Sequence, residues 1–182
     1  MSRGDRLRMP RLSQVGIYVK DMDRTIARYQ EVFGIGPWLV QTMKARRCEY
    51  QGCKAKLKSK IGVAFSGKVQ LELIQVLEGP NVYLDTLGGR EEGLHHLAFE
   101  VSDLEERVRA CREAGIEILQ EGTFKRLGMR IDYAYLDTRE SVGVILEFIQ
   151  TSLLGIKLRM YPAVVKLLAR SQERFGLPPG RS

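Results

Sequence analysis

Two parts of the sequence repeat one pattern, and this internal duplication constrains the fold more than any other feature. The segment QVGIYVKDM, from Gln14 to Met22, aligns without gaps with HLAFEVSDL, from His96 to Leu104. A second pair, VQLELIQ at 69–75 and VILEFIQ at 144–150, follows in the same order and at nearly the same spacing. Two ordered matches indicate a repeated structural unit, so we expect two copies of one supersecondary module.

Each copy begins with a strand that runs directly into a helix. In the second copy, residue alternation places His96, Ala98 and Glu100 on one face of the strand and apolar side chains on the other. Ser102 or Asp103 then offers a side-chain cap to a helix with apolar residues at helical spacing. In the first copy Asp21 is the expected cap of the corresponding helix.

The remaining elements follow from periodicity and from glycine and proline breaks. We expect strands at 14–20, 38–43, 56–65 and 68–75 around a helix at 21–33, with a hairpin turn at Ser66-Gly67. The second copy has a strand at 94–101, a helix at 103–114, and strands near 116–121, 131–137 and 143–150. This β-α-β-β-β order, with an antiparallel meander after each helix, predicts an α+β fold.

The predicted organisation has five parts. They are a loose N-terminus (1–12), a first module (13–76), a connection (77–93) with a short helical turn at 82–87, a second module (94–150) and a C-terminal helical tail (151–182). The tail helix begins near Pro162 and draws its apolar face from Val164, Val165, Leu167, Leu168 and Phe175, before Gly176. We expect this helix to cover a subunit contact, in a homodimer, or the mouth of a binding pocket.

Composition narrows the class of protein. The 182 residues are 44% hydrophobic and 28% charged, which is typical of a globular domain, and no apolar run approaches the ~20 residues of a membrane span. The basic N-terminus lacks the apolar core of a signal peptide, which favours the cytoplasm. Cys48, Cys53 and Cys111 are odd in number and lack zinc-site spacing, so they suit a reducing compartment.

The net charge of +7 is concentrated in two basic segments. One is Lys44–Arg47, and the other carries alternating lysines from Lys54 to Lys60, which on a strand would share one face. Such lysines can be a solvated edge that discourages strand addition, or an anion site for a phosphorylated substrate such as an acyl-CoA. Nucleic acid is disfavoured because few aromatic residues interleave with the lysines and no recognition motif is present.

The segments LHHLAFEVSDL, VKDMD and LEFIQ, set in this duplication, resemble the vicinal oxygen chelate superfamily. That superfamily includes glyoxalase I, methylmalonyl-CoA epimerase, extradiol dioxygenases and bleomycin-resistance proteins, and the resemblance covers about residues 12–150. It implies two tandem modules that form a partial barrel around a divalent metal ion. It also implies four ligands at matching repeat positions, which here are Gln14, Glu72, His96 and Glu147.

Strand parity supports this set of ligands. Glu72 and Glu147 each stand between two apolar residues, so each carboxylate lies on the face opposite its neighbours. Taken singly, a strand glutamate is usually solvated and a lone histidine is usually structural. His95 points to the opposite face from His96 and is left out of the site. The oxygen-rich donors suit zinc, cobalt, nickel, manganese or iron without distinguishing them.

The resemblance implies proton transfer next to a substrate carbonyl, with Glu147 as the base and Glu72 as its partner. Gln14 stands where extradiol dioxygenases have a histidine, which counts against oxygen chemistry. Glutamine there is typical of glyoxalase I, whereas LHHLAFEV is closer to methylmalonyl-CoA epimerase. The epimerase pattern is incomplete, because Tyr135-Leu136-Asp137 replaces a histidine-proline pair and Glu49 is the one candidate for an additional glutamate. A bleomycin-resistance-type binding protein is the non-catalytic alternative, although such proteins lack the four ligands.

Overall fold

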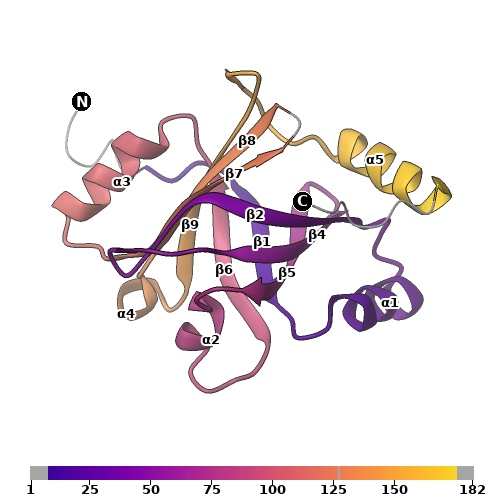
Figure 1. The fold of residues 1–182 in the computed structure, drawn as a ribbon, viewed down its shortest axis with the longest axis horizontal. Coiled ribbons are helices and arrows are strands. Elements are labelled where there is room, and N and C mark those ends of the chain that lie inside the picture. Colours follow the sequence, from indigo (N-terminus) through magenta and orange to yellow (C-terminus); the bar gives the residue numbers. More distant parts are fainter. Residues whose placement is uncertain (1–7, 127, 176–182) are drawn as a thin grey trace. The chain divides into compact units, whose positions relative to one another are not determined.

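The computed structural model describes residues 8–126 and 128–175, which form two compact units. Unit I comprises Gln14–Lys44, Lys56–His95 and the chain from Met160 on. Unit II comprises the chain up to Ser13 together with Ala45–Ala55 and His96–Arg159. Figure 1 shows their elements coloured from indigo at β1 to yellow at α5.

Unit I contains the first β-α-β-β-β module. Its elements are β1 (Leu12–Tyr18), α1 (Met22–Phe33), the first half of β2 (Leu39–Tyr50), β4 (Lys58–Ser66) and β5 (Val69–Glu78). Strand β1 pairs in parallel with β5, β5 pairs antiparallel with β4, and β4 pairs antiparallel with β2. The spatial order of the module's strands is therefore first, fourth, third, second.

Unit II repeats this arrangement. Its elements are β6 (Gly93–Glu100), α3 (Leu104–Glu113), β7 (Ile118–Arg126), β8 (Met129–Leu136) and β9 (Ile145–Leu153). Strand β6 pairs in parallel with β9, β9 pairs antiparallel with β8, and β8 pairs antiparallel with β7. The predicted duplication and α+β class are confirmed, because both modules have the same order and direction of strands.

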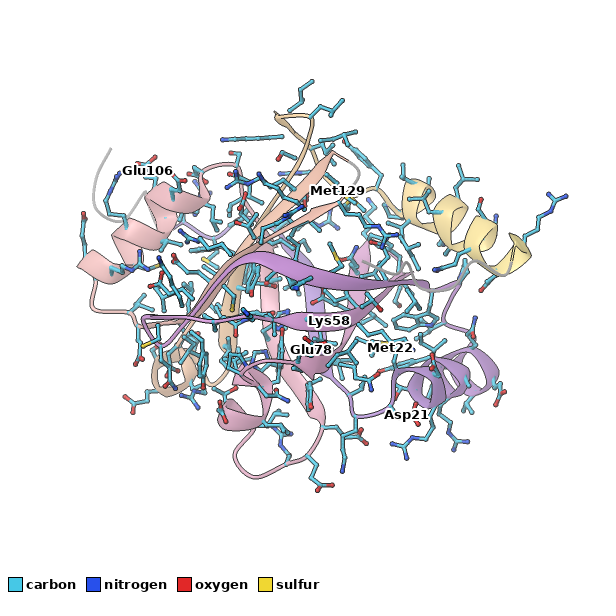
Figure 2. All side chains as sticks on the ribbon, in the orientation of Figure 1. Asp21, Met22, Lys58, Glu78, Glu106 and Met129 are labelled. Atoms are coloured by element: carbon cyan, nitrogen blue, oxygen red, sulfur yellow. The ribbon has the colours of Figure 1, made fainter. Side chains whose placement is uncertain are left out.

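In each unit, one helix covers one face of the strands. Helix α1 places the fully buried Met22 against Trp38 and Leu73 in unit I (Figure 2 labels Met22). Helix α3 places Val108 and Cys111 against Phe148 in unit II, with Leu146 at the edge of the same cluster. The residues between these apolar positions, which include Glu147, therefore lie on the opposite face of the strands.

The two module helices begin in different ways. The Asp21 side chain accepts a 3.0 Å hydrogen bond from the Arg24 amide, which confirms the predicted cap of α1. The prediction that the Ser102 or Asp103 side chain caps α3 was wrong, because Asp103 precedes the helix without such a bond. Its carboxylate accepts a 2.7 Å bond from Arg107 instead, and a charge-assisted bond outcompetes a backbone amide.

Strand β2 is much longer than the sequence predicted. It runs to Tyr50 and carries the basic segment Lys44–Arg47, because the second half of β2 pairs with β7 in unit II. Strand β9 likewise continues to Leu153, three residues past the predicted Gln150. Tertiary pairing extends both strands beyond the segments with clear alternation.

The alternating lysines do not share one strand face, contrary to expectation. Lys54 lies in the short β3 (Cys53–Lys54), and Lys58 and Lys60 lie in β4. Lys58 pairs with Glu78 across the β4–β5 ladder at 3.4 Å (Figure 2), and Lys60 pairs with Asp23 at 2.7 Å. Both lysines of β4 therefore already have carboxylate partners.

The predicted hairpin turn and the predicted short helical turn of the connection are present. Ser66 pairs with Val69 across a turn in which Gly67 has a φ of 61°, a conformation that favours glycine. The connection between the modules holds α2 (Val82–Thr86), and unit II also contains α4 (Arg139–Val142) and β10 (Ile156–Lys157). Among the described residues, no helix is long and apolar enough to cross a membrane.

The predicted tail helix is α5 (Pro162–Phe175), which packs within its own unit. Val165 and Ala169 are fully buried against Leu39 and Phe65, and the Gln172 amide donates to and accepts from the Val40 backbone. Three of the residues predicted on its apolar face are instead exposed, namely Val164, Leu167 and Leu168. Positions 1–7, the side chain of Phe175 and Gly176 lie outside the described residues.

Candidate metal centre

His96 and Glu147 meet in unit II, on the face of the strands that α3 leaves uncovered. The first lies on β6 and the second on β9, and the parallel pairing of these strands aligns Glu147 with Ala98. The His96 Nε2 atom lies 3.1 Å from Glu147 Oε2, and the residues are 0% and 3% exposed. An imidazole and a carboxylate buried in contact are the kind of pair that a metal ion holds.

This contact fits the donor atoms of one metal ion. Divalent ions such as zinc bind histidine nitrogen and carboxylate oxygen at about 2.0–2.2 Å, so neighbouring donor atoms of one ion lie about 3 Å apart. The observed 3.1 Å agrees with that spacing. The residues in unit II therefore match a metal centre in chemistry and in distance.

Two tyrosines of β8 complete this face of unit II, and the sequence did not single them out as site residues. Tyr135 pairs directly with Glu147 across the β8–β9 ladder, and its ring centroid lies 5.0 Å from that of His96. The Tyr133 ring lies 5.4 Å from the Tyr135 ring, and its hydroxyl accepts a 2.7 Å bond from Gln120 Nε2. Aromatic residues in a strand usually indicate an apolar core. The strand register, which pairs Tyr135 with Glu147, is the observation that puts the two tyrosines beside the candidate metal ligands.

Gln14 and Glu72 lie on adjacent strands of unit I. Gln14 of β1 pairs with Gln70 of β5, and Glu72 is two residues further along β5, so both predicted ligands share one face. The opposite face carries Leu73, which packs against α1. The structure therefore places the predicted ligand pair of each module on the face that its helix does not cover.

The orientation of Gln14 suits a metal ligand. This residue is 3% exposed, and its Nε2 atom donates a 2.5 Å hydrogen bond to Gln70 Oε1. Its Oε1 atom is buried and has no hydrogen-bond partner among the residues that the structure describes. A buried carbonyl oxygen without a partner is costly, and a metal ion would satisfy it.

Two other candidate residues lie away from these pairs. His95 Nε2 is 3.1 Å from Thr86 Oγ1 and its ring meets the Tyr83 ring edge-on at 4.6 Å, so leaving it out of the site agrees with its surroundings. Glu49 pairs across β2 and β7 with Glu121, which in turn pairs with Ala134 on the α3 side of the strands. Glu49 is therefore on the opposite face from Glu147 and does not belong to this centre.

Comparison with known families agrees with this architecture. Residues 13–135, more than half of the chain, match the model of the Glyoxalase/Bleomycin resistance protein/Dioxygenase superfamily. The chain belongs to this superfamily. A relative in sequence is the uncharacterized protein YqjC of Bacillus subtilis, which is 28% identical over 142 residues, or 76% of this chain and 91% of that protein.

Solved structures extend the comparison of the superfamily fold. The hypothetical protein BH1468 from Bacillus halodurans is 25% identical, with a TM-score of 0.51 over 76% of this chain and 92% of the other. Streptomyces coelicolor methylmalonyl-CoA epimerase in complex with 2-nitronate-propionyl-CoA is 20% identical, with a TM-score of 0.54 over 83% and 99%. A methylmalonyl-CoA epimerase in complex with methylmalonyl-CoA and NH4+ is 21% identical, with a TM-score of 0.52 over 83% and 99%. At these identities the epimerases establish a shared fold.

Proposed function

We propose that this protein is a metal-dependent isomerase or epimerase that moves a proton next to a carbonyl group. The metal ligands in this proposal are Gln14, Glu72, His96 and Glu147, which occupy matching positions in the two modules. Glu72, His96 and Glu147 offer one imidazole nitrogen and two carboxylate oxygens, a donor group of the type that holds a metal ion. The observation that carries the proposal is the buried contact between His96 and Glu147 in a chain of this superfamily.

A divalent ion in this centre supplies the positive charge that polarises a substrate carbonyl and favours loss of the neighbouring proton. In the proposed reaction the Glu147 carboxylate accepts that proton, so a carbon–hydrogen bond breaks and a carboxyl O–H bond forms. Glu72, the equivalent residue of the first module, begins the reaction as a carboxylic acid and donates its proton to the other face of the same carbon, so its O–H bond breaks and a new carbon–hydrogen bond forms. A proton acceptor and a proton donor on opposite faces of one carbon produce inversion at that carbon.

The proposed substrate class is a small carbonyl compound, with a branched acyl-CoA as the first candidate. The two epimerase structures that share this fold contain acyl-CoA ligands. Near 20% identity does not carry a substrate from one chain to another, so the acyl-CoA is part of the proposal. The buried ring of Tyr135 beside His96 would exclude water from the reacting carbon.

A glyoxalase I-like lyase is the second candidate, and Gln14 favours it. The Gln14 amide nitrogen donates to Gln70 and its buried oxygen has no hydrogen-bond partner among the described residues, which supports the oxygen as a ligand atom. A neutral amide oxygen beside two carboxylates and one imidazole is the set that resembles glyoxalase I. Both reactions share the same proton-transfer step, and they differ in the compound that carries the carbonyl.

The proposal includes a homodimer and a cytoplasmic location. The exposed apolar residues Val164, Leu167 and Leu168 of α5 offer a subunit contact. The cytoplasmic location is proposed because Cys48, Cys53 and Cys111 are odd in number and lack zinc-site spacing, which suits a reducing compartment.

Solvent deuterium exchange tests the proposed reaction. In heavy water, the metal-loaded protein should exchange the α-proton of methylmalonyl-CoA or of the hemithioacetal of methylglyoxal and glutathione, as followed by proton NMR. Glu147→Gln should slow the exchange roughly a hundred- to ten-thousand-fold, the contribution of a general base. Glu49→Gln is the matched control, because this glutamate lies on the opposite face of the strands. A loss below about tenfold for Glu147→Gln would assign the base to another residue.

A further inference from the structure

Four cationic side chains line a cleft of about 530 Å³ at the β7–β8 turn of unit II. The cations are Arg46, Lys125, Arg126 and Arg130, and the rest of the lining is Gly128, Met129, Ser152 and Gly155. No carboxylate is among these lining residues. Met129, labelled in Figure 2, is the first residue of β8 and marks this end of the unit.

The backbone brings these charges together at a cost. Lys125 lies directly opposite Arg130 in the β7–β8 ladder, and like charges in that arrangement destabilise a sheet. Arg46 is the additional residue of a β-bulge, because the register of β2 against β7 shifts between Ala45 and Arg47. Bulges redirect side chains and are frequent beside functional sites.

Nearby acids neutralise only part of this cluster. Asp132 accepts a 2.7 Å bond from Arg130, and Glu121 pairs with Arg47, which is outside the cleft lining. Within the described residues, no carboxylate pairs with Arg46, Lys125 or Arg126. The Arg126 Nη1 atom is buried and has no hydrogen-bond partner in that part of the chain. A buried guanidinium nitrogen without an acceptor costs free energy that a bound anion would recover.

Protection of a free sheet edge does not account for Arg130. Strand β7 pairs with β8 on one side and with β2 on the other as far as Phe124. Strand β8 pairs with β7 and with β9 over its length. Arg130 therefore has a paired strand on each side and does not guard an open ladder, whereas Lys125 and Arg126 follow the last β2 partner of β7.

We infer that this cleft binds the phosphate group of a phosphorylated small molecule. Arginine matches phosphate with paired hydrogen bonds, and three cations without acid partners suit a group that carries two or more negative charges. The Ser152 hydroxyl adds a donor on the strand next to Arg130. The cleft has no aromatic side chain on which nucleic-acid bases could stack.

The part of the ligand beyond its phosphate group can occupy a groove that adjoins the cleft. This groove, of about 820 Å³, runs between α3 and the strands and shares Arg130, Ser152 and Gly155 with the cleft. Arg130 and its ladder partner Lys125 have the same strand parity as Ala134, which packs under α3, so these two residues lie on the opposite face from Tyr135 and Glu147. None of the residues that line the cleft is a proposed metal ligand.

Titration calorimetry with two probes at low ionic strength tests the inference. Inorganic pyrophosphate and adenosine 3′,5′-bisphosphate should each bind one site per chain with a dissociation constant of about 1 mM or lower. Arg126→Gln and Arg46→Gln should each weaken binding about tenfold, the loss of one charge-assisted bond. Arg28→Gln, an exposed arginine of α1 with the same change in net charge, should weaken binding less than about twofold.

The melting temperature without ligand shows whether the variants are folded. Because like charges repel in the empty cleft, Arg126→Gln should melt at or above the temperature of the unmodified protein. Tighter binding of the nucleotide than of pyrophosphate supports a ligand that extends into the groove, and equal binding supports recognition of the phosphates alone. No saturable binding of either probe, or equal losses in Arg28→Gln and Arg126→Gln, would overturn the inference. So would binding of a single-stranded oligonucleotide in preference to both probes.

Discussion

Tyr135 lies directly across the β8–β9 ladder from Glu147, and its ring packs 5.0 Å from the ring of His96. Tyr135 is thus a direct neighbour of both Glu147 and His96 in the candidate metal centre. All three are at most 3% exposed. This relationship explains how an imidazole and a carboxylate from two different strands are held in one orientation, since close packing restricts both side chains.

Removal of this ring should loosen the site and destabilise the fold. Tyr135→Ala leaves a cavity beside His96 and should lower the free energy of unfolding by roughly 3 kcal/mol or more, as large-to-small changes of buried aromatic residues do. Urea denaturation measures this loss. Tyr135→Phe is the matched control, because it keeps the ring and should cost less than about 1.5 kcal/mol. Equal losses in the two variants would show that the hydroxyl, rather than the ring, supports the site.

Neighbouring valines of α5 should differ sharply in their effect on stability. Val165 is fully buried against β2 and β4, whereas Val164 is 49% exposed. In dilute protein, where any homodimer has dissociated, Val165→Ala should therefore lower the free energy of unfolding by about 1–2 kcal/mol, and Val164→Ala by less than about 0.5 kcal/mol. Thermal or chemical denaturation separates these outcomes. Similar effects of both changes would mean that another face of α5 is packed in solution.

Cysteine reactivity should follow burial. Burial raises the pKa of the Cys48 and Cys111 thiols, so at pH 8 fewer of them are in the reactive thiolate form, while Cys53 is exposed. Iodoacetamide should label Cys53 of the native protein first, and all three cysteines after denaturation. Mass spectrometry of the labelled peptides gives the result. Rapid labelling of Cys111 in native protein would show that α3 opens from the strands.

The sequence predicted the architecture because the two copies of the module carry it redundantly. Gln14 aligns with His96 and Glu72 with Glu147, and the strand ladders repeat in the same order. The N-cap of α3 was not predictable in this way, because Arg107 competes for Asp103 from one turn further along the helix. Local signals cannot report a competitor that depends on packing.

The surroundings of the candidate sites were less accessible from sequence. Tyr135 reads as apolar core until its register with Glu147 is known, and that register depends on β8 and β9 pairing. Arg46 belongs to a basic segment that follows the predicted strand at 38–43. In the structure this segment is part of β2, and a bulge in β2 places Arg46 in the lining of the cleft. Long-range pairing decides both positions, and a single sequence does not contain it.

Metal content is the most direct test of the proposed centre. After reconstitution, elemental analysis of the purified protein should find close to one divalent ion per chain. His96→Ala should lose most of that metal, and Gln14→Ala should weaken its binding less, because a neutral amide oxygen is a poorer donor than an imidazole. His95→Ala is the matched control, since the adjacent histidine contacts Thr86 and Tyr83 and should keep the metal when circular dichroism shows a folded chain. Absence of metal in the reconstituted protein, or equal loss in His95→Ala and His96→Ala, would contradict the metal centre and favour a binding protein without chemistry.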